Sequence, residues 1–207
     1  MAMYAYPISR SSFRYRTHFT FYIYFTMLFG GGMVPWYIIC TQVLKMKNTI
    51  WALIVPYLFN VFYVIILRTF FKTIHESIIE SAKLDGASEI KIFRSIILPL
   101  SLPVLASVGL FTSIGYWNDW WLSLMFQDSG YWINLQYAMY KVLENATYLA
   151  TLSGGAGGGL TQSQLANMPT ETMRMAMCVF AIGPIILAYP FFQRYFVSGL
   201  TIGSIKG

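Results

Sequence analysis

Charged residues are scarce in this sequence: they make up 11% of its 207 residues, whereas a soluble domain usually carries about 25%. Four long runs contain no Asp, Glu, Lys, Arg or His: residues 19–44, 48–67, 95–118 and 175–193. Each run has about the length, roughly 20 residues, that crosses a hydrocarbon core as a helix. A backbone in lipid must satisfy its own hydrogen bonds, so these runs are expected to be helical. The sequence therefore predicts an all-α, polytopic transmembrane helical bundle and excludes an ordinary soluble domain.

Cysteine and histidine are rare as well, with two of each. Cys40 and Cys178 lie in predicted spans, where a small buried apolar side chain is the usual role. His18 and His75 have no second ligand at metal-binding spacing. The Gly-rich stretch at 153–159 is not followed by Gly-Lys-Ser or Gly-Lys-Thr, so it predicts a flexible linker and no phosphate-binding loop. We expect no metal site, no catalytic residue and no directly bound cofactor.

The net charge of +6 follows from an uneven placement of basic residues. With four spans, both chain ends and the central segment, which we define as residues 72–96, fall on one side. The basic residues on that side are Arg10, Arg14, Arg16, Arg68, Lys72, Lys83, Lys91, Arg94, Arg194 and Lys206. Those on the other side are Lys45, Lys47, Lys141 and Arg174. Since Lys and Arg favour the cytoplasmic side, both ends are expected in the cytoplasm. This topology accounts for the charge, and nucleic acid is not expected as a partner.

The predicted organisation is a single transmembrane domain over residues 1–207. Spans are expected at about 18–44, 49–71, 97–126 and 173–196, with an external loop at 127–172 and a cytoplasmic tail at 197–207. The first residues are apolar and then basic, without the pattern of a signal peptide, so they predict the end of an earlier helix of a longer protein.

Two features inside the spans carry expectations of their own. The glycines at 30–32, followed by Pro35, predict a kinked packing face in the first span, with a break on a substrate path as the alternative. Asn60 in the second span is expected to bond a neighbouring helix.

The central segment interrupts the apolar pattern, since six charged residues fall within residues 80–99. Asp85-Gly86 favours a tight turn between two short amphipathic helices. The apolar stripes of these helices, at helical spacing, are Ile74, Ile78 and Ala82 before the turn and Ile90, Phe93 and Ile97 after it. Four acidic residues argue against a position in the lipid headgroups. Two uses stay open: packing on the ends of the spans, or docking to a cytoplasmic partner.

A known signature matches this part of the chain. The pattern of residues 80–99 resembles the EAA signature of permease subunits of binding-protein-dependent ABC importers. It consists of Glu80-Ser81-Ala82, three residues, Gly86, nine residues, Ile96, one residue and Leu98-Pro99, with Ser81 in place of the first Ala.

Further stretches are similar to the maltose-type, carbohydrate-importing permeases, namely Ala5–Arg10, Trp117–Asp119 and Gln193–Gly207. Residues 31–37 resemble the subgroup that handles oligosaccharides or polysaccharide fragments. The chain is thereby identified as a member of the type I ABC importer permease kind, truncated at its N-terminus.

The resemblance implies the roles of individual residues. The central segment would couple to the ATPase through Glu80, Ser81, Ala82, Asp85, Gly86, Ile90, Phe93, Ile96, Leu98 and Pro99. In this set Gly86 would supply the turn, and Ile96, Leu98 and Pro99 a stiff junction to the third span. The tail glycines Gly199, Gly203 and Gly207 would also contact the ATPase.

The implied partners are an ATPase dimer that uses ATP, a second homologous permease subunit, an extracytoplasmic sugar-binding protein and the bacterial plasma membrane. The chain itself would be no enzyme. It would form half of the pathway for a sugar or oligosaccharide. The alternatives are a permease for a non-sugar solute, or a non-transporting fragment that lacks two helices.

The end of the third span allows two interpretations. Trp117, Asn118, Asp119 and Trp120, followed by Trp121, could line a translocation path, where aromatic faces stack on sugar rings and Asn and Asp bond hydroxyl groups. Tryptophan also gathers at membrane interfaces for structural reasons alone. An acidic group near lipid usually faces a cavity or a partner, which singles out Asp119.

Overall fold

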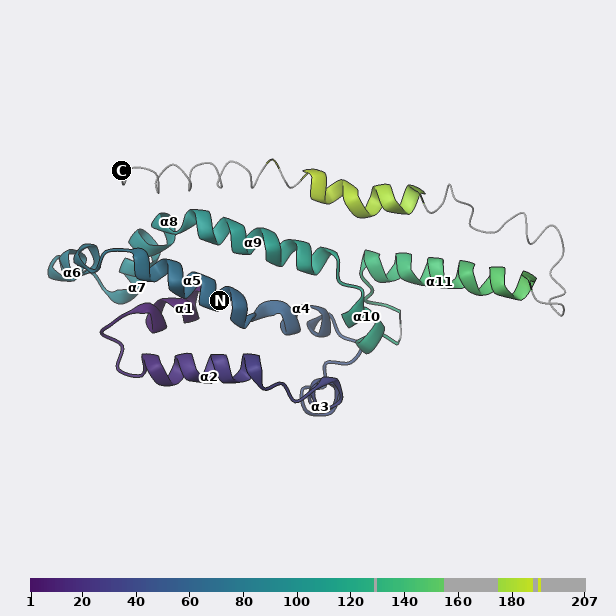
Figure 1. Ribbon diagram of the computed structural model, residues 1–207, viewed down its shortest axis with the longest axis horizontal. Helices are drawn as coiled ribbons and strands as arrows, with labels where there is room; N and C mark the ends of the chain where they lie inside the picture. Colours follow the sequence, from purple (N-terminus) through teal and green to yellow (C-terminus); the bar gives the residue numbers. More distant parts are fainter. Residues whose placement is uncertain (129, 155–174, 188–189, 191–207) are drawn as a thin grey trace.

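The computed structural model describes residues 1–128, 130–154, 175–187 and 190, and these residues form helices and connections without a strand (Figure 1). The chain begins with α1 (Ala2–Ser9), α2 (Arg16–Leu28), α3 (Met33–Ile38) and a π-helical turn, η1 (Ile39–Val43). The axes of α2 and of the α3–η1 helix, which together fill the first predicted span, are bent by 111°. Gly32 between them takes φ +85°, a left-handed value that residues with a side chain rarely adopt. The glycines therefore break this span, more sharply than the predicted kink.

The second predicted span is divided into α4 (Trp51–Leu58) and α5 (Val61–Thr73), which are bent by 42°. Pro56 has no N–H to donate to the Ala52 carbonyl, which weakens the last turns of α4. Asn60 then caps α5, because its side-chain oxygen accepts a hydrogen bond from the Phe62 N–H at 2.9 Å. The prediction that Asn60 bonds a neighbouring helix is not met among the described residues, where its side-chain oxygen caps its own helix.

The central segment contains α6 (Glu76–Leu84) and α7 (Glu89–Ile92). A π-helical turn, η2 (Phe93–Ile97), and the short α8 (Leu98–Leu100) lead from it to α9 (Leu102–Trp117). The axis bends by 80° between Leu100 and Leu102. Pro103 lacks the N–H that would bond the Pro99 carbonyl, and this loss favours the bend. The junction implied to be stiff is therefore helical through Leu100 and turns sharply just after it.

Two further helices follow the third span: α10 (Trp121–Phe126) and α11 (Leu135–Gly154). The sequence predicted an external loop at 127–172, so α11 was missed; its mixed polar and apolar residues lack the long charge-free run that marked the spans. A helix at Met175–Leu187 lies inside the fourth predicted span. The predicted tail at 197–207 lies outside the described residues.

Among the described residues, no single helix is both long and apolar enough to cross a bilayer. Three bent pairs pass that test jointly by length and composition: Arg16–Leu28 with Met33–Val43, Trp51–Leu58 with Val61–Thr73, and Glu89–Leu100 with Leu102–Trp117. The first two pairs overlap closely with the first two predicted spans, whereas the third pair begins in the central segment and overlaps the third predicted span only in part.

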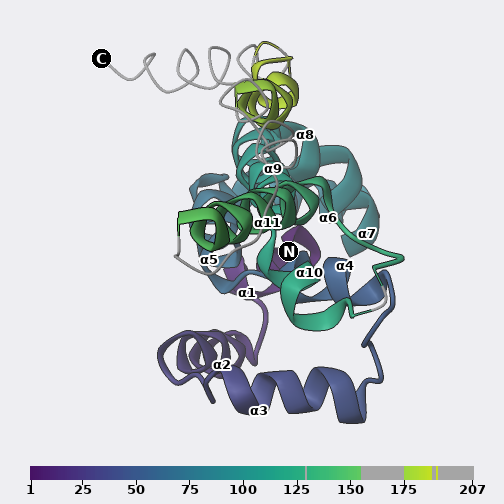
Figure 2. The same ribbon diagram turned by 90° about the vertical axis from the view of Figure 1, so that its right-hand side faces the viewer.

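The helices form layers around α5 (Figures 1 and 2). α2 and α3 lie on one side, α1 and α5 lie in the middle, and α9 with the helix at 175–187 lies on the other side. The main core includes Phe71, Leu67 and Val64 of α5, Ile8 of α1 and Ile92 of α7, each at most 2% exposed. This core attaches the central segment to the spans.

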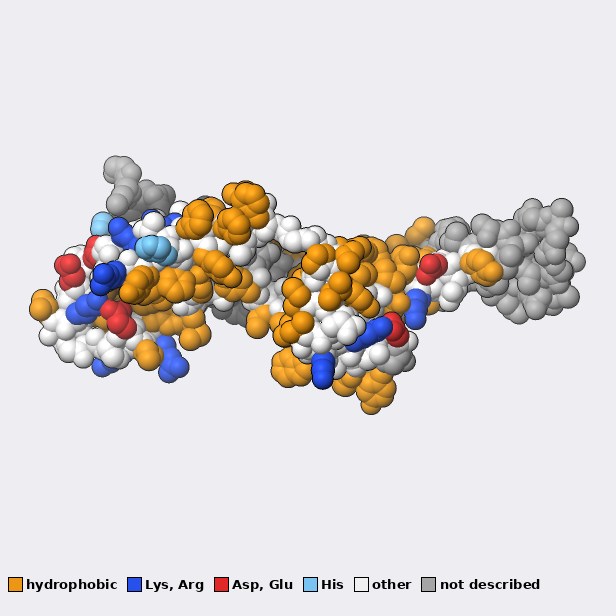
Figure 3. Space-filling view, turned by 90° about the horizontal axis from the view of Figure 1, so that it is seen from below, with side chains coloured by type: hydrophobic (Ala, Val, Ile, Leu, Met, Phe, Trp, Pro, Cys, Tyr) orange, Lys and Arg blue, Asp and Glu red, His pale blue; other side chains and the backbone are white. Residues whose placement is uncertain are grey.

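A second core lies at the opposite end of the spans. Phe126 of α10 is fully buried and contacts Trp36 and Tyr37, with ring centroids 5.2 Å and 5.5 Å away. Outside the two cores, apolar side chains cover broad areas of the surface (Figure 3), including Leu28 and Phe21 of α2. Such a surface fits helices that face lipid.

Phe71→Ala is expected to lower the free energy of unfolding by about 3–5 kcal/mol, because it opens a cavity in the main core. Phe62→Ala on the same helix is the matched control, since Phe62 is 55% exposed and its loss opens no internal cavity. Thermal unfolding of both variants in mild detergent measures the difference. Equal shifts for the two variants would contradict the placement of the core.

Candidate functional site

The turn of the central segment requires glycine for its backbone. Gly86 has φ +77°, and the N–H of Ala87 closes the turn by donating to the Ala82 carbonyl at 2.9 Å. A Cβ built at Gly86 would meet no atom within 4 Å. The need for glycine therefore comes from the left-handed backbone and not from crowding. The two helices around a glycine turn, predicted from the sequence, are present.

Two polar contacts hold α6 and α7 at this turn. Ser88 caps α7, its hydroxyl accepting a hydrogen bond from the Lys91 N–H at 3.4 Å. Lys83 near the end of α6 pairs with Glu89 at the start of α7 across 2.6 Å. Glu89 in the first turn of α7 also suits the positive end of that helix. The turn is thereby fixed by short-range contacts that both helices share.

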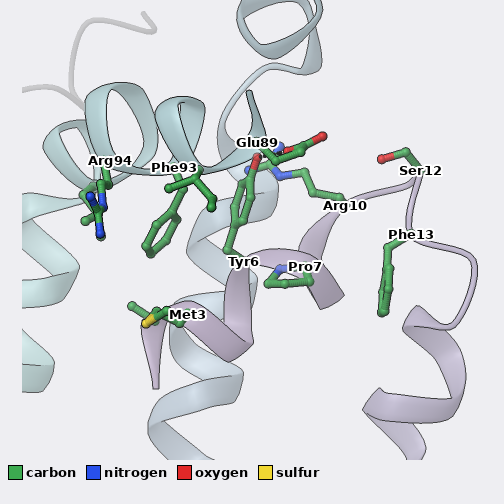
Figure 4. Close-up of a pocket in the computed structure, with 12 residues that line it drawn as sticks. Met3, Tyr6, Pro7, Arg10, Ser12, Phe13, Glu89, Phe93 and Arg94 are labelled. Atoms are coloured by element: carbon green, nitrogen blue, oxygen red, sulfur yellow. Dashed lines mark hydrogen bonds between the residues drawn. The ribbon is translucent and has the colours of Figure 1, made fainter. Parts of the chain in front are cut away.

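Tyr6 of α1 connects the central segment to the helical body. Its hydroxyl donates to the Glu89 carboxylate at 2.8 Å, and its ring lies 5.2 Å from that of Phe93 (Figure 4). Tyr6 itself is only 7% exposed. A charge-assisted hydrogen bond and an aromatic contact therefore anchor the start of α7 on α1.

Arg10 provides a second anchor just after α1. It is 8% exposed, it donates to the Phe71 carbonyl at 3.0 Å, and its guanidinium group lies 5.1 Å from the centre of the Tyr6 ring. Burial lowers the pKa of the Arg10 guanidinium from its ordinary value. The Phe71 carbonyl belongs to the last turn of α5, where the helix leaves carbonyls unbonded, so Arg10 satisfies one of them.

The structure separates the predicted coupling residues into two groups. Glu80, Ser81, Asp85, Ile90 and Pro99 are exposed, whereas Ala82, Phe93, Ile96 and Leu98 are partly buried. The predicted apolar stripes are therefore wrong in part, because Ile78 and Ile90 face outward and Ile79 and Ile92 are buried in their place. Isoleucines occur at both positions of the Ile78-Ile79 pair, so spacing alone did not decide which one meets the core.

Leu84 was missed by the sequence analysis. It closes α6 beside the turn and is 89% exposed, while Ile90 on α7 is 67% exposed. An apolar side chain this exposed, in a segment with charged neighbours, is a candidate contact for another protein. In the sequence, Leu84 could have been noticed as an apolar residue that belongs to neither of the two predicted stripes.

A cavity of about 770 Å³ lies between α1 and the α7–η2 helix (Figure 4). Its apolar walls include Met3, Tyr6 and Phe93, and charged Arg10, Glu89 and Arg94 also line it. It places the exposed Ile90 next to an apolar recess. The described residues contain no group of three His, Cys, Asp or Glu side chains that could hold a metal ion.

Asp119 is a buried junction between three parts of the chain. It is 7% exposed, and its Oδ1 accepts hydrogen bonds from the Tyr57 hydroxyl at 3.0 Å and the Leu122 N–H at 3.3 Å. The Asn134 amide donates to its Oδ2 at 3.2 Å and also to its carbonyl oxygen. These contacts tie α4, the start of α10 and the residue just before α11. They support the structural interpretation of this residue.

The neighbouring residues also make structural contacts. Trp117 donates its indole N–H to the Ala181 carbonyl at 2.8 Å, which joins α9 to the helix at 175–187. Asn118 ends α9. Trp120 stacks on Tyr140 of α11, with ring centroids 4.9 Å apart, and is 38% exposed. Trp120 therefore has an accessible side, whereas Asp119 does not. The tail glycines Gly199, Gly203 and Gly207 lie outside the described residues.

Comparison with known proteins identifies relatives over nearly the whole chain. Residues 2–202 match the family described as "Binding-protein-dependent transport system inner membrane component". The chain is 38% identical to the polygalacturonan/rhamnogalacturonan transport system permease protein YtcP of Bacillus subtilis, over 98% of this chain and 68% of that protein. It is 29% identical to the trehalose/maltose transport system permease protein MalG of Thermococcus litoralis, over 98% of this chain and 67% of that protein.

A solved structure has the same arrangement of helices. It is the crystal structure of a bacterial ABC transporter involved in the import of the acidic polysaccharide alginate, matched with a TM-score of 0.78 and 28% sequence identity. The match covers 95% of this chain and 67% of the solved one. The chain thus spans about two thirds of the length of these similar proteins.

Glu89→Gln is expected to loosen the central segment, because it removes the ion pair with Lys83 and weakens the bond from Tyr6. A net loss of about 1 kcal/mol corresponds to roughly fivefold faster backbone hydrogen exchange in α6 and α7. Glu80→Gln, on the exposed side of α6, is the control and should leave exchange unchanged. Unaltered exchange in Glu89→Gln would show that Tyr6 and Lys83 do not hold the segment.

Asp119→Ala is expected to destabilise the fold by about 1–3 kcal/mol for each buried donor left without an acceptor. Asp128→Ala is the matched control. Asp128 is exposed and accepts a hydrogen bond from exposed Lys47, which raises the pKa of that ammonium group, and exposed pairs contribute little to stability. Thermal unfolding in detergent compares the two. If Asp119→Ala is no less stable than Asp128→Ala, the junction does not stabilise the fold.

Proposed function

Because this chain belongs to the family of binding-protein-dependent transport system inner membrane components, we propose that it forms half of the translocation pathway of an ATP-driven importer for an oligosaccharide or polysaccharide fragment. It is a permease subunit. In this proposal it carries out no chemistry, binds no cofactor, and depends on a separate ATPase that consumes ATP.

The observation that carries the proposal is the exposed end of the central segment. α6 and α7 project from one end of the helical body (Figure 1), and Leu84 and Ile90 are exposed on either side of the Gly86 turn. A short helix pair that is attached on one face and carries exposed apolar side chains among polar ones on its free face is suited to dock into a groove of a partner. We assign that groove to the ATPase.

The contacts of α1 give the docked segment a mechanical link to the spans. Glu89 is bonded to Tyr6, and Arg10 bonds the last turn of α5, so α1 joins α7 to the second span. A packed element of this kind transmits a displacement because it cannot deform continuously. We infer that movement of the ATPase reaches α5 through α1 and reaches α9 through the η2–α8 connection.

Within the proposal, Glu80 and Asp85 are exposed polar contacts beside the turn, Gly86 is the turn itself, and Ile90 with Leu84 forms the apolar contact. Ser81 donates to the Ser77 carbonyl at 2.9 Å, so its hydroxyl is satisfied within α6. Ala82, Phe93, Ile96 and Leu98 act through packing, and exposed Pro99 through its place just before the bend.

The direction of insertion follows from charge. The basic residues near the central segment support a cytoplasmic position for it, and in this proposal the end with Asp119 and Trp120 faces outward. Here a sugar-binding protein would dock, and the exposed side of Trp120 could stack on a sugar ring. The named relatives support a carbohydrate as cargo, since one carries polygalacturonan or rhamnogalacturonan and another trehalose or maltose. A second homologous permease subunit would complete the pathway.

Replacing both Leu84 and Ile90 with Asp is expected to abolish co-purification of an ATPase subunit from mild-detergent membranes, as identified by mass spectrometry. Both side chains are largely exposed, so the change should leave the fold intact. Charged side chains cannot be buried in an apolar groove without a large desolvation cost. The transport of labelled oligosaccharides into cells should fall in parallel.

Tyr131→Asp provides the control, because Tyr131 is an apolar residue of similar exposure (79%) at the other end of the molecule. It should retain the ATPase. Recovery of the same ATPase by the Leu84/Ile90 double variant would show that the central segment is not the docking element. A co-purified ATPase with uptake of a non-sugar solute would support the importer and reject the carbohydrate.

A further inference from the structure

A groove of about 870 Å³ lies between α2 and α5, and nothing described so far occupies it. We call it the α2–α5 groove. Basic residues line one end of it, Arg16 from α2 and Arg68 and Lys72 from α5. Thr17 and Thr20 follow, and the rest of its wall is apolar and aromatic, formed by Phe21, Tyr24, Phe25, Leu28 and Phe29.

The basic end lacks a counter-charge. No Asp or Glu lines the groove. The two ion pairs found in the described part of the chain, Lys47 with Asp128 and Lys83 with Glu89, involve none of its basic residues. Lys72 is repelled electrostatically by both Arg68 and Arg16. Like charges held together near lipid, without a protein anion, favour binding of an external anion.

The first turn of α2 adds to this preference. The helix has no side-chain cap and no acidic residue in its first turn, and Arg16 is its first residue. The Arg16 N–H donates to the Phe13 carbonyl at 3.1 Å, and the positive end of the helix dipole lies at the same end of the groove as the basic side chains. One turn further on, Thr20 also lines the groove, and its buried hydroxyl has no hydrogen-bond partner.

The apolar wall continues from this end along α2. Phe21, Phe25 and Phe29 lie on one side of the helix at four-residue spacing and are 69%, 46% and 66% exposed. At a rise of 1.5 Å per residue, Phe21 to Phe29 covers about 12 Å, which fits within the roughly 15 Å hydrocarbon depth of one leaflet.

We propose that the α2–α5 groove binds one anionic phospholipid of the cytoplasmic leaflet, with its phosphate group at the basic end and an acyl chain along the aromatic wall of α2. Charge complementarity selects the headgroup, and the direction of the groove matches the orientation of a lipid in that leaflet. The inference rests on the proposed cytoplasmic position of the basic end and needs neither the ATPase nor a sugar. The lipid would fill a gap between α2 and α5, and thereby hold the otherwise exposed α2 against the body.

Lipid selection provides the test. The native protein, purified from its membrane in mild detergent, is placed in nanodiscs of phosphatidylcholine with about one tenth phosphatidylglycerol, and retained lipids are identified by native mass spectrometry. We expect one phosphatidylglycerol to be retained in preference to phosphatidylcholine. Arg16→Gln and Lys72→Gln should each reduce this preference about fivefold, since a basic residue near the membrane surface contributes on the order of 1 kcal/mol.

The variants leave Arg68 unchanged, because its Nε donates to the Ile8 carbonyl at 3.2 Å and supports the fold. The control combines Arg14→Gln with Lys91→Gln, which removes two charges from the same side of the membrane outside the groove. It should retain phosphatidylglycerol. A double variant with both Arg16→Gln and Lys72→Gln would overturn the proposal if it retained as much phosphatidylglycerol as the native protein. The proposal would also be overturned if the control lost as much phosphatidylglycerol as the double variant.

A photo-crosslinking amino acid in place of Phe25 identifies the occupant directly. A crosslink to phospholipid supports the proposal, and a crosslink to a polypeptide, whether a second permease subunit or another part of this protein, overturns it. The readout involves no nucleotide, ATPase or cargo. Failure of the ATPase co-purification would therefore leave the lipid result standing, and failure of lipid binding would leave the importer proposal standing.

Discussion

The attachment of α1 to two other helices is the interaction on which the rest of the structure depends. α1 has only eight residues, yet Tyr6 bonds Glu89 of α7 and Arg10, one residue beyond the helix, bonds the Phe71 carbonyl of α5. Both side chains are more than nine-tenths buried. Together with the hydrogen bond that the Ser11 hydroxyl donates to the Glu76 carboxylate of α6, they hold the central segment by directed contacts, which fix position more specifically than apolar packing alone.

The sequence predicted those parts of the fold that depend on composition or on neighbouring residues. The charge-free runs indicated helices, Asp85-Gly86 indicated the turn, and the signature around it indicated the family. It did not predict Tyr6 and Arg10 as anchors, because their partners lie 83 and 61 residues away. The choice of Ile79 over Ile78 for the core was hidden for the same reason.

The positions of breaks in the helices were easier to predict from the sequence than the sizes of the bends. The glycines before Pro35 were recognised as a weak point, but the size of the bend depends on what packs around them, and the bend near Ser101 was not predicted. For Asn60 the role itself was open, since a polar residue in an apolar run could bond a neighbouring helix or cap its own helix. The broken backbone decided between these two uses. Asp119 was singled out as a residue that could face a cavity or a partner, and its three hydrogen-bond partners within the chain explain why an acidic residue occurs there.

The bend of 80° between the central segment's helix and α9 has a geometric consequence for motion. The helix at Glu89–Leu100 and α9 are joined at nearly a right angle, so a movement along one becomes a sideways movement of the other. A push along the axis of the first helix has almost no component along the second, so it swings α9 sideways and does not slide it lengthwise. For a helix whose side chains face lipid, swinging exchanges one set of neighbours for another and changes the depth of each residue much less than sliding would. The bend thus converts a thrust into a tilt while each apolar residue stays within the hydrocarbon layer.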